Sequence, residues 1–205
     1  GVEMSGAISE LVRLVLKKDY PKIDINEVRV ILLEATDNLV SNLGKHLSQA
    51  TITALQRKKV EVLLGKMVKN YDGKTVQLVE GDPIAARTFI WTAGVRAAEL
   101  VDSAGLPQSK QGRAFVRPTL QLTAYDNVYS IGDSAFFEGA DGTPLPMTAP
   151  VAMQQAKQAA RNIMAQLTGK DLQPFQYHDP GMMATIGRNQ AVAKIGRFQF
   201  HGWPA

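Results

Sequence analysis

Apolar and polar residues alternate with a helical period in three stretches of this chain. The first begins almost at the first residue, where apolar side chains recur at Met4, Ile8, Leu11 and Val15. The second covers residues 45–58, and the third covers residues 149–167, whose expected buried stripe is Val151, Ala159, Ile163 and Leu167. A proline near the start of the third stretch and Gly169 after it are typical of helix ends. The pattern therefore predicts three helices.

Shorter apolar runs between these helices predict buried strands. Four such runs cover residues 28–34, 60–64, 88–95 and 128–131. Runs of this length that are apolar on both faces are typical of strands in a covered parallel sheet rather than of helices. Strands that alternate with helices indicate an α/β fold.

Two further pairs of runs predict antiparallel hairpins. Residues 68–78 alternate in character on either side of Asp72-Gly73, which is among the strongest short signals for a hairpin. Residues 182–187 and 191–196 are joined by the turn residues Arg188-Asn189 and predict a second pair of strands.

Two acidic residues stand at the ends of predicted strands. Open α/β sheets bind ligands beyond the carboxyl ends of their strands. Glu34 ends the run 28–34 at about the place where a dinucleotide-binding unit carries its ribose-binding acid, which favours NAD because a 2′-phosphate would be repelled. Asp133 follows Gly132 directly after the run 128–131. The alternatives are a solvent-exposed strand end for Glu34 and a helix N-cap for Asp133.

The start of the third helix is a candidate binding site for a polar or anionic group. Pro150 in the first turn leaves free N–H groups and the positive end of the helix dipole. The amides of Gln154 and Gln155 follow within the next turn. A phosphate, a ribityl hydroxyl or an electron-rich ring would suit this place, whereas solvated amides on an exposed helix face are the alternative for the two glutamines.

These motifs, taken in order, resemble a known family. Gly132-Asp133 and the run 149–155, Ala-Pro-Val-Ala-Met-Gln-Gln, resemble the flavin-binding half of two-dinucleotide-binding-domain flavoproteins, in particular the type II NADH dehydrogenases, or NADH:quinone oxidoreductases. Residues 1–6, Gly-Val-Glu-Met-Ser-Gly, are similar to the end of that family's NADH fingerprint, and residues 177–196 to its C-terminal region. The resemblance covers essentially the whole chain, and the order of the motifs makes it specific.

The resemblance implies a set of functional residues. The cofactor-binding positions are Gly1, Glu34, Ala93, Gly94, Gly132, Asp133, Ala149, Pro150, Val151 and Ala152. Glu3 matches an acid that lies near the nicotinamide and the flavin, where burial would raise its pKa and let it hold or pass a proton. An acid favoured by the dipole of the first helical turn is the alternative for Glu3. Gln154 and Gln155 match a pair near the quinone ring, where amides can hydrogen-bond the quinone carbonyls.

The resemblance also implies an activity and a domain organisation. NADH would reduce FAD, and electrons would pass to a quinone of the respiratory chain without proton pumping, at the cytoplasmic face of a bacterial membrane to which the protein binds peripherally. Residues 1–97 would be the NADH-binding domain without its first strand, and residues 98–205 the C-terminal part of the FAD-binding domain and the start of a C-terminal domain. We expect the chain to be an internal fragment that lacks the FAD fingerprint and the membrane-binding segment and is inactive alone.

The composition argues against several classes of function. Hydrophobic residues make up 45% of the chain and charged residues 20%, as in ordinary globular proteins. The net charge of +4 is scattered along the chain, which argues against nucleic-acid binding. The chain has no cysteine, so it cannot form a disulfide, a thiolate nucleophile or a Cys-bound iron–sulfur cluster. Its three histidines lack metal-ligand spacing, and no apolar run is long enough to span a membrane.

Two other functions remain open at the level of sequence. The first is a flavin reductase of the same architecture that serves a soluble electron-transfer protein. The second is an interaction module that keeps the fold without catalysis. Homodimer formation is also left open.

Overall fold

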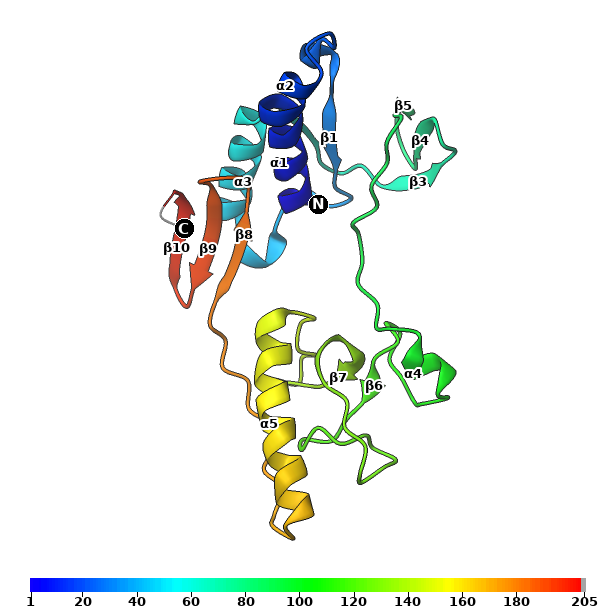
Figure 1. The fold of residues 1–205 in the computed structure, drawn as a ribbon, viewed down its shortest axis with the longest axis vertical. Coiled ribbons are helices and arrows are strands. Elements are labelled where there is room, and N and C mark those ends of the chain that lie inside the picture. The colour runs from blue at the N-terminus through cyan, green and yellow to red at the C-terminus, as the bar shows by residue number, and fades with distance from the viewer. Residues whose placement is uncertain (204–205) are drawn as a thin grey trace. The chain divides into compact units, whose positions relative to one another are not determined.

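The computed structural model describes residues 1–203, which form two compact units (Figure 1). The first unit contains Gly1–Ala93 and the described residues from Gly181 onward, and the second contains Gly94–Pro180. The expected division assigned residues 98–205 to the C-terminal part of an FAD-binding domain and the start of a C-terminal domain. The structure groups residues 181–203 with the first unit, because Ile186 and Val192 are buried in its core.

The first unit is built on a strand–helix–strand motif. Strand β1 (Val30–Leu33) pairs in parallel with β2 (Val60–Leu63), and helix α3 (Lys45–Arg57) connects them. A crossover helix of this kind is the ordinary link between parallel strands. The prediction of two strands and a helix in these segments is confirmed. Short helical turns at Ile25–Glu27 and Ser41–Leu43 lie in the connections.

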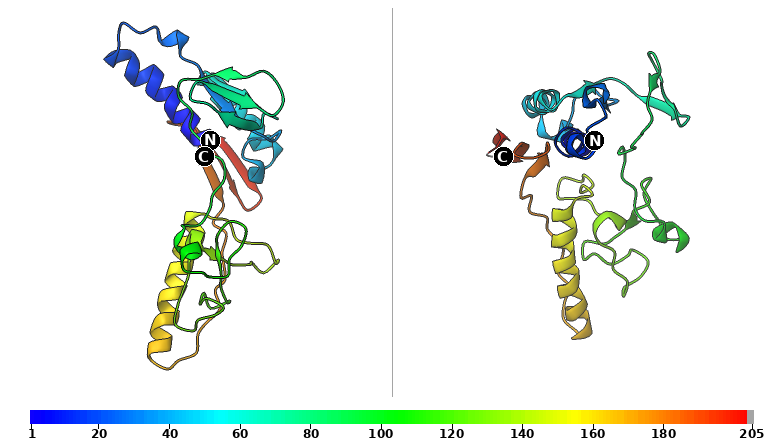
Figure 2. Two further views of the ribbon diagram at one scale, coloured as in Figure 1. Left: turned by 90° about the vertical axis from the view of Figure 1, so that its right-hand side faces the viewer. Right: turned by 45° about the horizontal axis from the view of Figure 1, so that its top comes forward.

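Both predicted hairpins are confirmed (Figure 2). Strands β3 (Val68–Tyr71) and β4 (Thr75–Leu78) meet at a turn in which the Asp72 carboxylate accepts the N–H groups of Lys74 and Thr75, and β5 (Ile84–Ala85) adds a third strand. The second sheet has the order β10-β9-β8 and consists of β8 (Met182–Thr185), β9 (Ala191–Ile195) and β10 (Phe198–Gly202).

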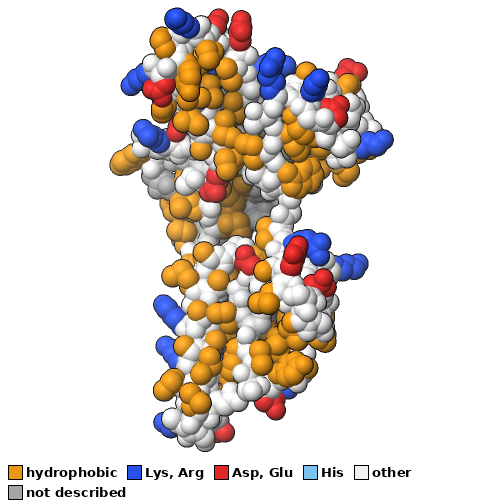
Figure 3. All heavy atoms as spheres, turned by 45° about the vertical axis from the view of Figure 1, so that its right-hand side comes forward, with side chains coloured by type: hydrophobic (Ala, Val, Ile, Leu, Met, Phe, Trp, Pro, Cys, Tyr) orange, Lys and Arg blue, Asp and Glu red, His pale blue; other side chains and the backbone are white. Residues whose placement is uncertain are grey.

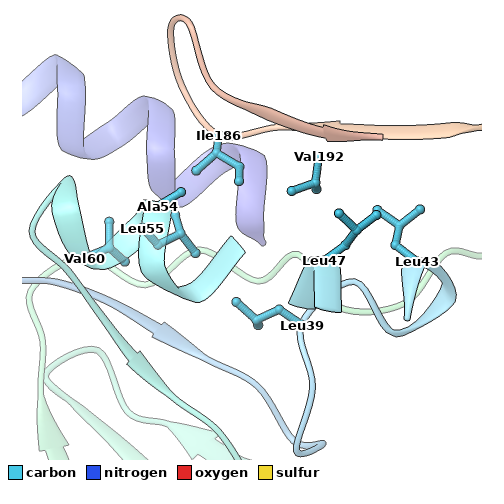
Figure 4. Packing of buried hydrophobic residues seen from close by; sticks show 8 residues of the cluster. All are labelled: Leu39, Leu43, Leu47, Ala54, Leu55, Val60, Ile186 and Val192. Atoms are coloured by element: carbon cyan, nitrogen blue, oxygen red, sulfur yellow. The ribbon is translucent and has the colours of Figure 1, made fainter. Parts of the chain in front are cut away.

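The core of the first unit lies between α3 and the hairpin of β8 and β9. Leu43 and Leu47 point toward one another, and Ile186 and Val192 point toward α3 from the hairpin (Figure 4). Leu47, Leu55 and Ile186 are completely buried. Each such side chain contributes about 1.5–3 kcal/mol when it leaves water, so the hairpin is an integral part of this unit.

The first predicted helix forms, but with a different buried face. Helix α1 (Val2–Glu10) continues into a π-helical turn at Leu11–Leu16 and a short helix α2 (Lys17–Asp19). Met4, Leu11 and Val15, which were expected to be buried, are 46%, 47% and 42% exposed.

Small residues form the buried face of α1 instead. Ser5, Gly6 and Ser9 are buried, and a Cβ atom on Gly6 would lie 3.0 Å from the backbone of Ile186 and Gly187. The hydroxyl of Ser9 donates to the carbonyl of Lys58 at the end of α3. Only small side chains allow two backbones to pack this closely. Because these residues are not apolar, the spacing of apolar residues does not predict that they are buried.

The second unit combines one long helix with short strands and turns. Helix α5 (Ala149–Leu167) ends at the expected residues, and helix α4 (Leu100–Ser103) is a single turn. Strands β6 (Ala114–Phe115) and β7 (Ala135–Phe136) pair in parallel, and a 3₁₀ turn at Gly132–Ser134 precedes β7. The core is formed by apolar side chains around α5, namely Leu120, Phe137, Leu145, Val151, Ala159 and Phe175.

The buried face of α5 is partly polar. Gln155 and Asn162 are buried together with Val151 and Ala159, whereas Ile163 and Leu167 of the expected stripe are 40% and 76% exposed. The side chain of Asn162 bonds the backbone of Thr119 and Gln173. Hydrogen bonds to loop backbone therefore replace apolar contacts along the second half of the helix.

Two predicted strands are wrong. Residues 88–95 are extended but are not paired in any sheet of the described chain, and Trp91 is 60% exposed. Residues 128–131 contain only an isolated bridge from Tyr129 to Gln121, with Val128 41% and Ile131 36% exposed. An apolar run becomes a regular strand only where a neighbouring strand takes up its backbone hydrogen bonds along its length. Residues 88–95 have no such strand among the described residues. Residues 128–131 meet only the short segment 120–122, through the bonds of the Leu122 N–H to Val128 and of the Ser130 N–H to Leu120.

The surface has mixed character. Hydrophobic side chains lie among scattered Lys and Arg side chains in the view of Figure 3, without a single basic patch. None of the helices within residues 1–203 is both long and apolar enough to cross a lipid bilayer. No group of three or more His, Cys, Asp or Glu side chains within these residues is arranged to hold a metal ion.

Candidate functional site

The turn Gly132–Ser134 is the centre of the candidate site in the second unit. Ile131 arrives in an extended conformation, and Gly132 then adopts a φ of 64°, which residues with a side chain rarely accept. A Cβ atom on Gly132 would lie 3.2 Å from Cβ of Ala152. Gly132 is buried and Asp133 is exposed. A glycine thus lets the turn approach α5 closely while the next residue presents a carboxylate outward.

The two glutamines of α5 have different partners. Gln155 is fully buried, and its Oε1 accepts the backbone N–H of Gly132 at 2.6 Å. Its Nε2 has no hydrogen-bond partner in the described structure. Gln154 is half-buried and pairs twice with the backbone of His178, donating from Nε2 at 2.8 Å and accepting at Oε1 at 3.0 Å. The structure therefore brings Gln155 to the turn of Asp133, and it brings Gln154 to the chain after α5.

The first turn of α5 carries free backbone donors. Thr148 caps the helix without a side-chain hydrogen bond, and Pro150 contributes no N–H. The first intrahelical bond of this end runs from the Ala152 N–H to the Thr148 carbonyl at 3.1 Å. The N–H groups of Ala149 and Val151 precede the first residues that can find an acceptor within the helix. They lie at the positive end of the helix dipole, which favours a carbonyl, a hydroxyl or an anion.

Arg113 belongs to this site and was missed by sequence reasoning. Its side chain is 2% exposed, and its Nε donates to the Ala135 carbonyl at 2.8 Å. The guanidinium lies 5.6 Å from the centre of the Phe136 ring, and one of its terminal nitrogens has no partner in the described structure. Burial lowers the pKa of Arg113, and the nearby carboxylate of Asp133 partly opposes that shift. The only signal in the sequence was a basic residue before a predicted turn, which is too common to single out.

Of the residues expected at the dinucleotide, Gly1, Glu34 and Ala93 lie in the first unit, and Gly94 is the first residue of the second unit. Gly1 caps the start of α1, and its carbonyl accepts the Ser5 N–H at 2.9 Å. Glu34 follows β1, and its Oε1 accepts both the N–H and the hydroxyl of Thr36 at 2.8 and 2.9 Å. Both residues therefore lie at the ends of elements, where a dinucleotide fold places its binding groups.

Glu3 is exposed, although its proposed proton-holding role assumed burial. Its Oε1 accepts the backbone N–H and the hydroxyl of Thr185 in β8, at 3.1 and 3.2 Å. Ala93 and Gly94 are exposed and lie in the extended segment that follows β5, with Gly94 at a φ of 81°.

A cavity of about 680 Å³ lies in the first unit and is lined mainly by apolar residues. Residues 28–33 of β1 and its approach form one part of the lining, and residues 84–93 and the inward side of α1 form others. Among the described residues β1 pairs only with β2, so its other edge is unpaired. An open strand edge of this kind can pair with a further strand.

The chain is similar to a defined set of flavoproteins. A profile of the pyridine nucleotide-disulphide oxidoreductase family matches residues 1–156. The type II NADH:quinone oxidoreductase Ndh of Mycobacterium tuberculosis is 38% identical over 100% of this chain and 46% of that protein. The type II NADH:quinone oxidoreductase of Haemophilus influenzae is 31% identical over 95% of this chain and 44% of that protein. The chain thus spans about half the length of these curated relatives.

The fold is similar to that of solved structures of related enzymes. The structure of NDH2 from Plasmodium falciparum in complex with NADH matches 98% of this chain and 56% of that chain, with a TM-score of 0.83 at 16% identity. A likeness at this level of identity concerns the fold. It confirms the Rossmann-like α/β fold class expected from the order of strands and helices.

Proposed function

Because the chain belongs to the pyridine nucleotide-disulphide oxidoreductase family, we propose that it carries part of the catalytic machinery of a type II NADH:quinone oxidoreductase. NADH and FAD are the redox partners in this proposal, and a quinone receives the electrons without proton pumping. The chain has no cysteine, so it cannot supply the redox-active disulfide from which the family takes part of its name.

The residues of the second unit fit FAD. One observation carries this assignment: the Nε2 group of Gln155 is buried without a partner, beside the start of α5, whose first N–H groups are also free. A buried donor left unsatisfied is destabilising by about 1–3 kcal/mol, so such donors mark a place where a ligand supplies acceptors. Ala149, Pro150, Val151 and Ala152 at the helix start, with Gly132 and Asp133, would hold the cofactor.

Residues of this chain would bind and orient the flavin at this site. The Asp133 carboxylate would accept a hydrogen bond from a ribityl hydroxyl, and the helix start would stabilise negative charge at a carbonyl of the ring. Gly132 and Ala152 pack too closely for water to enter between the turn and the helix. Bound FAD would supply the chemistry of accepting a hydride and releasing electrons. The protein supplies orientation and exclusion of water.

The first unit supports the NADH half of the proposal. We assign residues 1–97 to the NADH-binding domain, with Gly1, Glu34, Ala93 and Gly94 at the dinucleotide and Glu3 near the nicotinamide. The unpaired edge of β1 and the apolar cavity beside it are suited to a further strand of the sheet. This arrangement supports a dinucleotide-binding domain whose first strand is not among these residues. Residues 98–180 are assigned to the FAD-binding domain.

The two glutamines of α5 are the residues proposed at the acceptor end of the reaction. The Oε1 of Gln155 is engaged with Gly132, so its free Nε2 is the atom of that side chain that can bond a ligand carbonyl. Both polar atoms of Gln154 are bonded to the backbone of His178, so this amide would have to share those partners to bond a quinone. Peripheral binding to the cytoplasmic face of a membrane, and a homodimeric state, complete the proposal. Both depend on parts of the protein beyond these contacts.

The proposal is tested on the full-length protein purified with its flavin. Anaerobic addition of NADH is expected to bleach the flavin absorbance, and subsequent addition of a short-chain quinone is expected to restore it. Asp133→Asn should weaken FAD retention, while Asp141→Asn, a change of the same kind on an exposed loop, should not. Absence of bound flavin in the wild-type protein would refute the proposal. Reoxidation by a ferredoxin or rubredoxin but not by quinone would favour a reductase with a soluble acceptor.

A further inference from the structure

We propose that Arg113 and Gln155 act together as positioning residues that hold the two ends of the Gly132–Ser134 turn and thereby fix the direction of Asp133. We call these two side chains and the turn they hold the turn clamp. The proposal deepens the proposed function, because Asp133 is there the residue that binds FAD. Neither side chain of the clamp has to touch the reacting atoms for it to work.

The first end of the turn is held by Gln155. Its Oε1 accepts the N–H of Gly132, the first residue of the turn, at 2.6 Å across 23 positions of sequence. Gln155 is fully buried, so water does not compete for this bond. The bond therefore ties the entry of the turn to the second turn of α5.

The second end of the turn is held by Arg113. Ala135 ends the turn, and its N–H donates to the carbonyl of Gly132. The carbonyl of Ala135 in turn accepts the Arg113 Nε at 2.8 Å, and the guanidinium stacks near the following ring of Phe136. Arg113 is only 2% exposed to solvent. A buried guanidinium bonded to a carbonyl is a rigid anchor, because the planar group has few alternative orientations.

The residue between the two anchors has no anchor of its own. Asp133 is exposed, and no hydrogen bond joins its carboxylate to another described residue, although its charge interacts with that of Arg113. The direction of the carboxylate is consequently set by the backbone of the turn. That backbone includes Gly132 at a φ of 64°, a conformation that needs support from its surroundings. Loss of either anchor should therefore reorient Asp133.

The alternative is that Arg113 and Gln155 only stabilise the core of the second unit. The two explanations differ in what they predict for variants of Asp133. If the clamp acts through Asp133, loss of Arg113 weakens FAD binding in the wild-type background and has little further effect once Asp133 is already disabled. Gln155, whose free Nε2 is proposed to face the cofactor directly, is judged by hydrogen exchange of the Gly132 amide. If the clamp is only structural, the loss of FAD affinity caused by Arg113→Met adds to the loss caused by Asp133→Asn.

The test uses the full-length protein and four single variants. Arg113→Met and Gln155→Met remove one anchor each. Gln155→Glu keeps an oxygen acceptor for the Gly132 N–H and serves as the conservative rescue, and Arg161→Met repeats the arginine change on the exposed face of α5. Hydrogen exchange of the Gly132 and Ala135 amides is measured without added FAD, and FAD affinity is measured by fluorescence, alone and combined with Asp133→Asn.

The turn clamp predicts three results. Exchange at Gly132 and Ala135 rises in Arg113→Met and Gln155→Met, and it stays near the wild-type rate in Gln155→Glu and Arg161→Met. FAD affinity falls about tenfold in Arg113→Met, the loss expected when one well-placed hydrogen bond to the cofactor is misaligned. In the Asp133→Asn background the same change weakens binding less than about twofold.

Other outcomes would overturn the inference or its premise separately. Unchanged hydrogen exchange at the Gly132 and Ala135 amides in both methionine variants would show that Arg113 and Gln155 do not hold the turn. Raised exchange with fully additive losses of FAD affinity would leave Arg113 and Gln155 as ordinary core residues. Failure of the wild-type protein to bind FAD would overturn the proposed function, and the exchange data would still decide whether the two anchors hold the turn.

Discussion

Replacing Asn162 by alanine should destabilise the second unit more than any exposed change on the same helix. Asn162 is 1% exposed, and its Nδ2 donates to the carbonyls of Thr119 and Gln173 at 2.9 and 2.8 Å. Its Oδ1 accepts the Gln173 N–H at 3.0 Å and also the side chain of Gln158 at 3.2 Å. The side chain therefore joins α5 to two loops at once.

The magnitude follows from what each partner loses. Gln173 is exposed, so water can replace the lost bonds there, and each is worth about 1 kcal/mol. The Thr119 carbonyl is only partly accessible, and leaving it unpaired costs about 1–2 kcal/mol. Alanine has a helix propensity better by about 0.6 kcal/mol, which offsets part of the loss. The expected net destabilisation is about 2–3 kcal/mol.

The assay must report on the second unit alone. Both tryptophans, Trp91 and Trp203, belong to the first unit, so intrinsic tryptophan fluorescence would follow the wrong part of the chain. Native-state hydrogen exchange of the α5 amides measures the relevant opening free energy. Met164→Ala is the control, because Met164 is 60% exposed and a change there should stay within about 0.5 kcal/mol. Equal effects of Asn162→Ala and Met164→Ala would refute the reasoning.

Three further predictions concern the first unit. Partial desolvation raises the pKa of Glu10, but hydrogen bonds from Lys58 and from the Arg188 N–H outweigh this and hold the pKa below its usual range. The first unit should therefore lose stability as the pH falls through that lowered pKa. Denaturant titrations at several pH values should show that Glu10→Gln reduces this loss of stability at acidic pH. Gly6→Val should destabilise by about 1–3 kcal/mol through overpacking against the backbone of Ile186 and Gly187, in the turn between β8 and β9, whereas Ala7→Val at an exposed position should not. Equal denaturation midpoints for the two variants would contradict the close packing at Gly6. In the full-length enzyme, Glu34→Arg should lower the preference for NADH over NADPH because a guanidinium pairs with a 2′-phosphate, and an unchanged ratio of specificities would remove Glu34 from the dinucleotide site.

Elements fixed by local signals were predictable from the sequence. The hairpin at Asp72-Gly73, helix α3 and helix α5 begin and end close to the expected residues, because turn chemistry, periodicity and the terminal proline act within a few positions. The fold class followed from the order of these elements. The failures at residues 88–95 and 128–131 share a cause, since an apolar run alone does not say whether a partner strand is available.

The candidate site was predictable only in part. The motif residues Gly132, Asp133 and Gln155 could be named from their order, and the structure brings them together. Their connections could not be named, because the bonds that hold the turn join residues 22 and 23 positions apart through single side chains. Arg113 is the clearest case, since its role comes from burial beside Ala135 and nothing near it in the sequence marks it.

The first unit is assembled from two stretches of chain that are far apart, and this has a consequence for how the protein folds. Its core needs Ile186 and Val192, and Glu3 is bonded to Thr185 across 182 positions. The second unit is one continuous stretch, so its core can close as soon as that stretch leaves the ribosome.

The amino-terminal half of the first unit must meanwhile wait with Leu39, Leu43 and Leu47 uncovered until the last strands arrive. Contacts of such long range slow folding, and the exposed cluster makes nascent or truncated chains that stop before residue 181 prone to aggregate. The hairpin of β8 and β9 thus completes the core of a stretch of chain that is translated well before it.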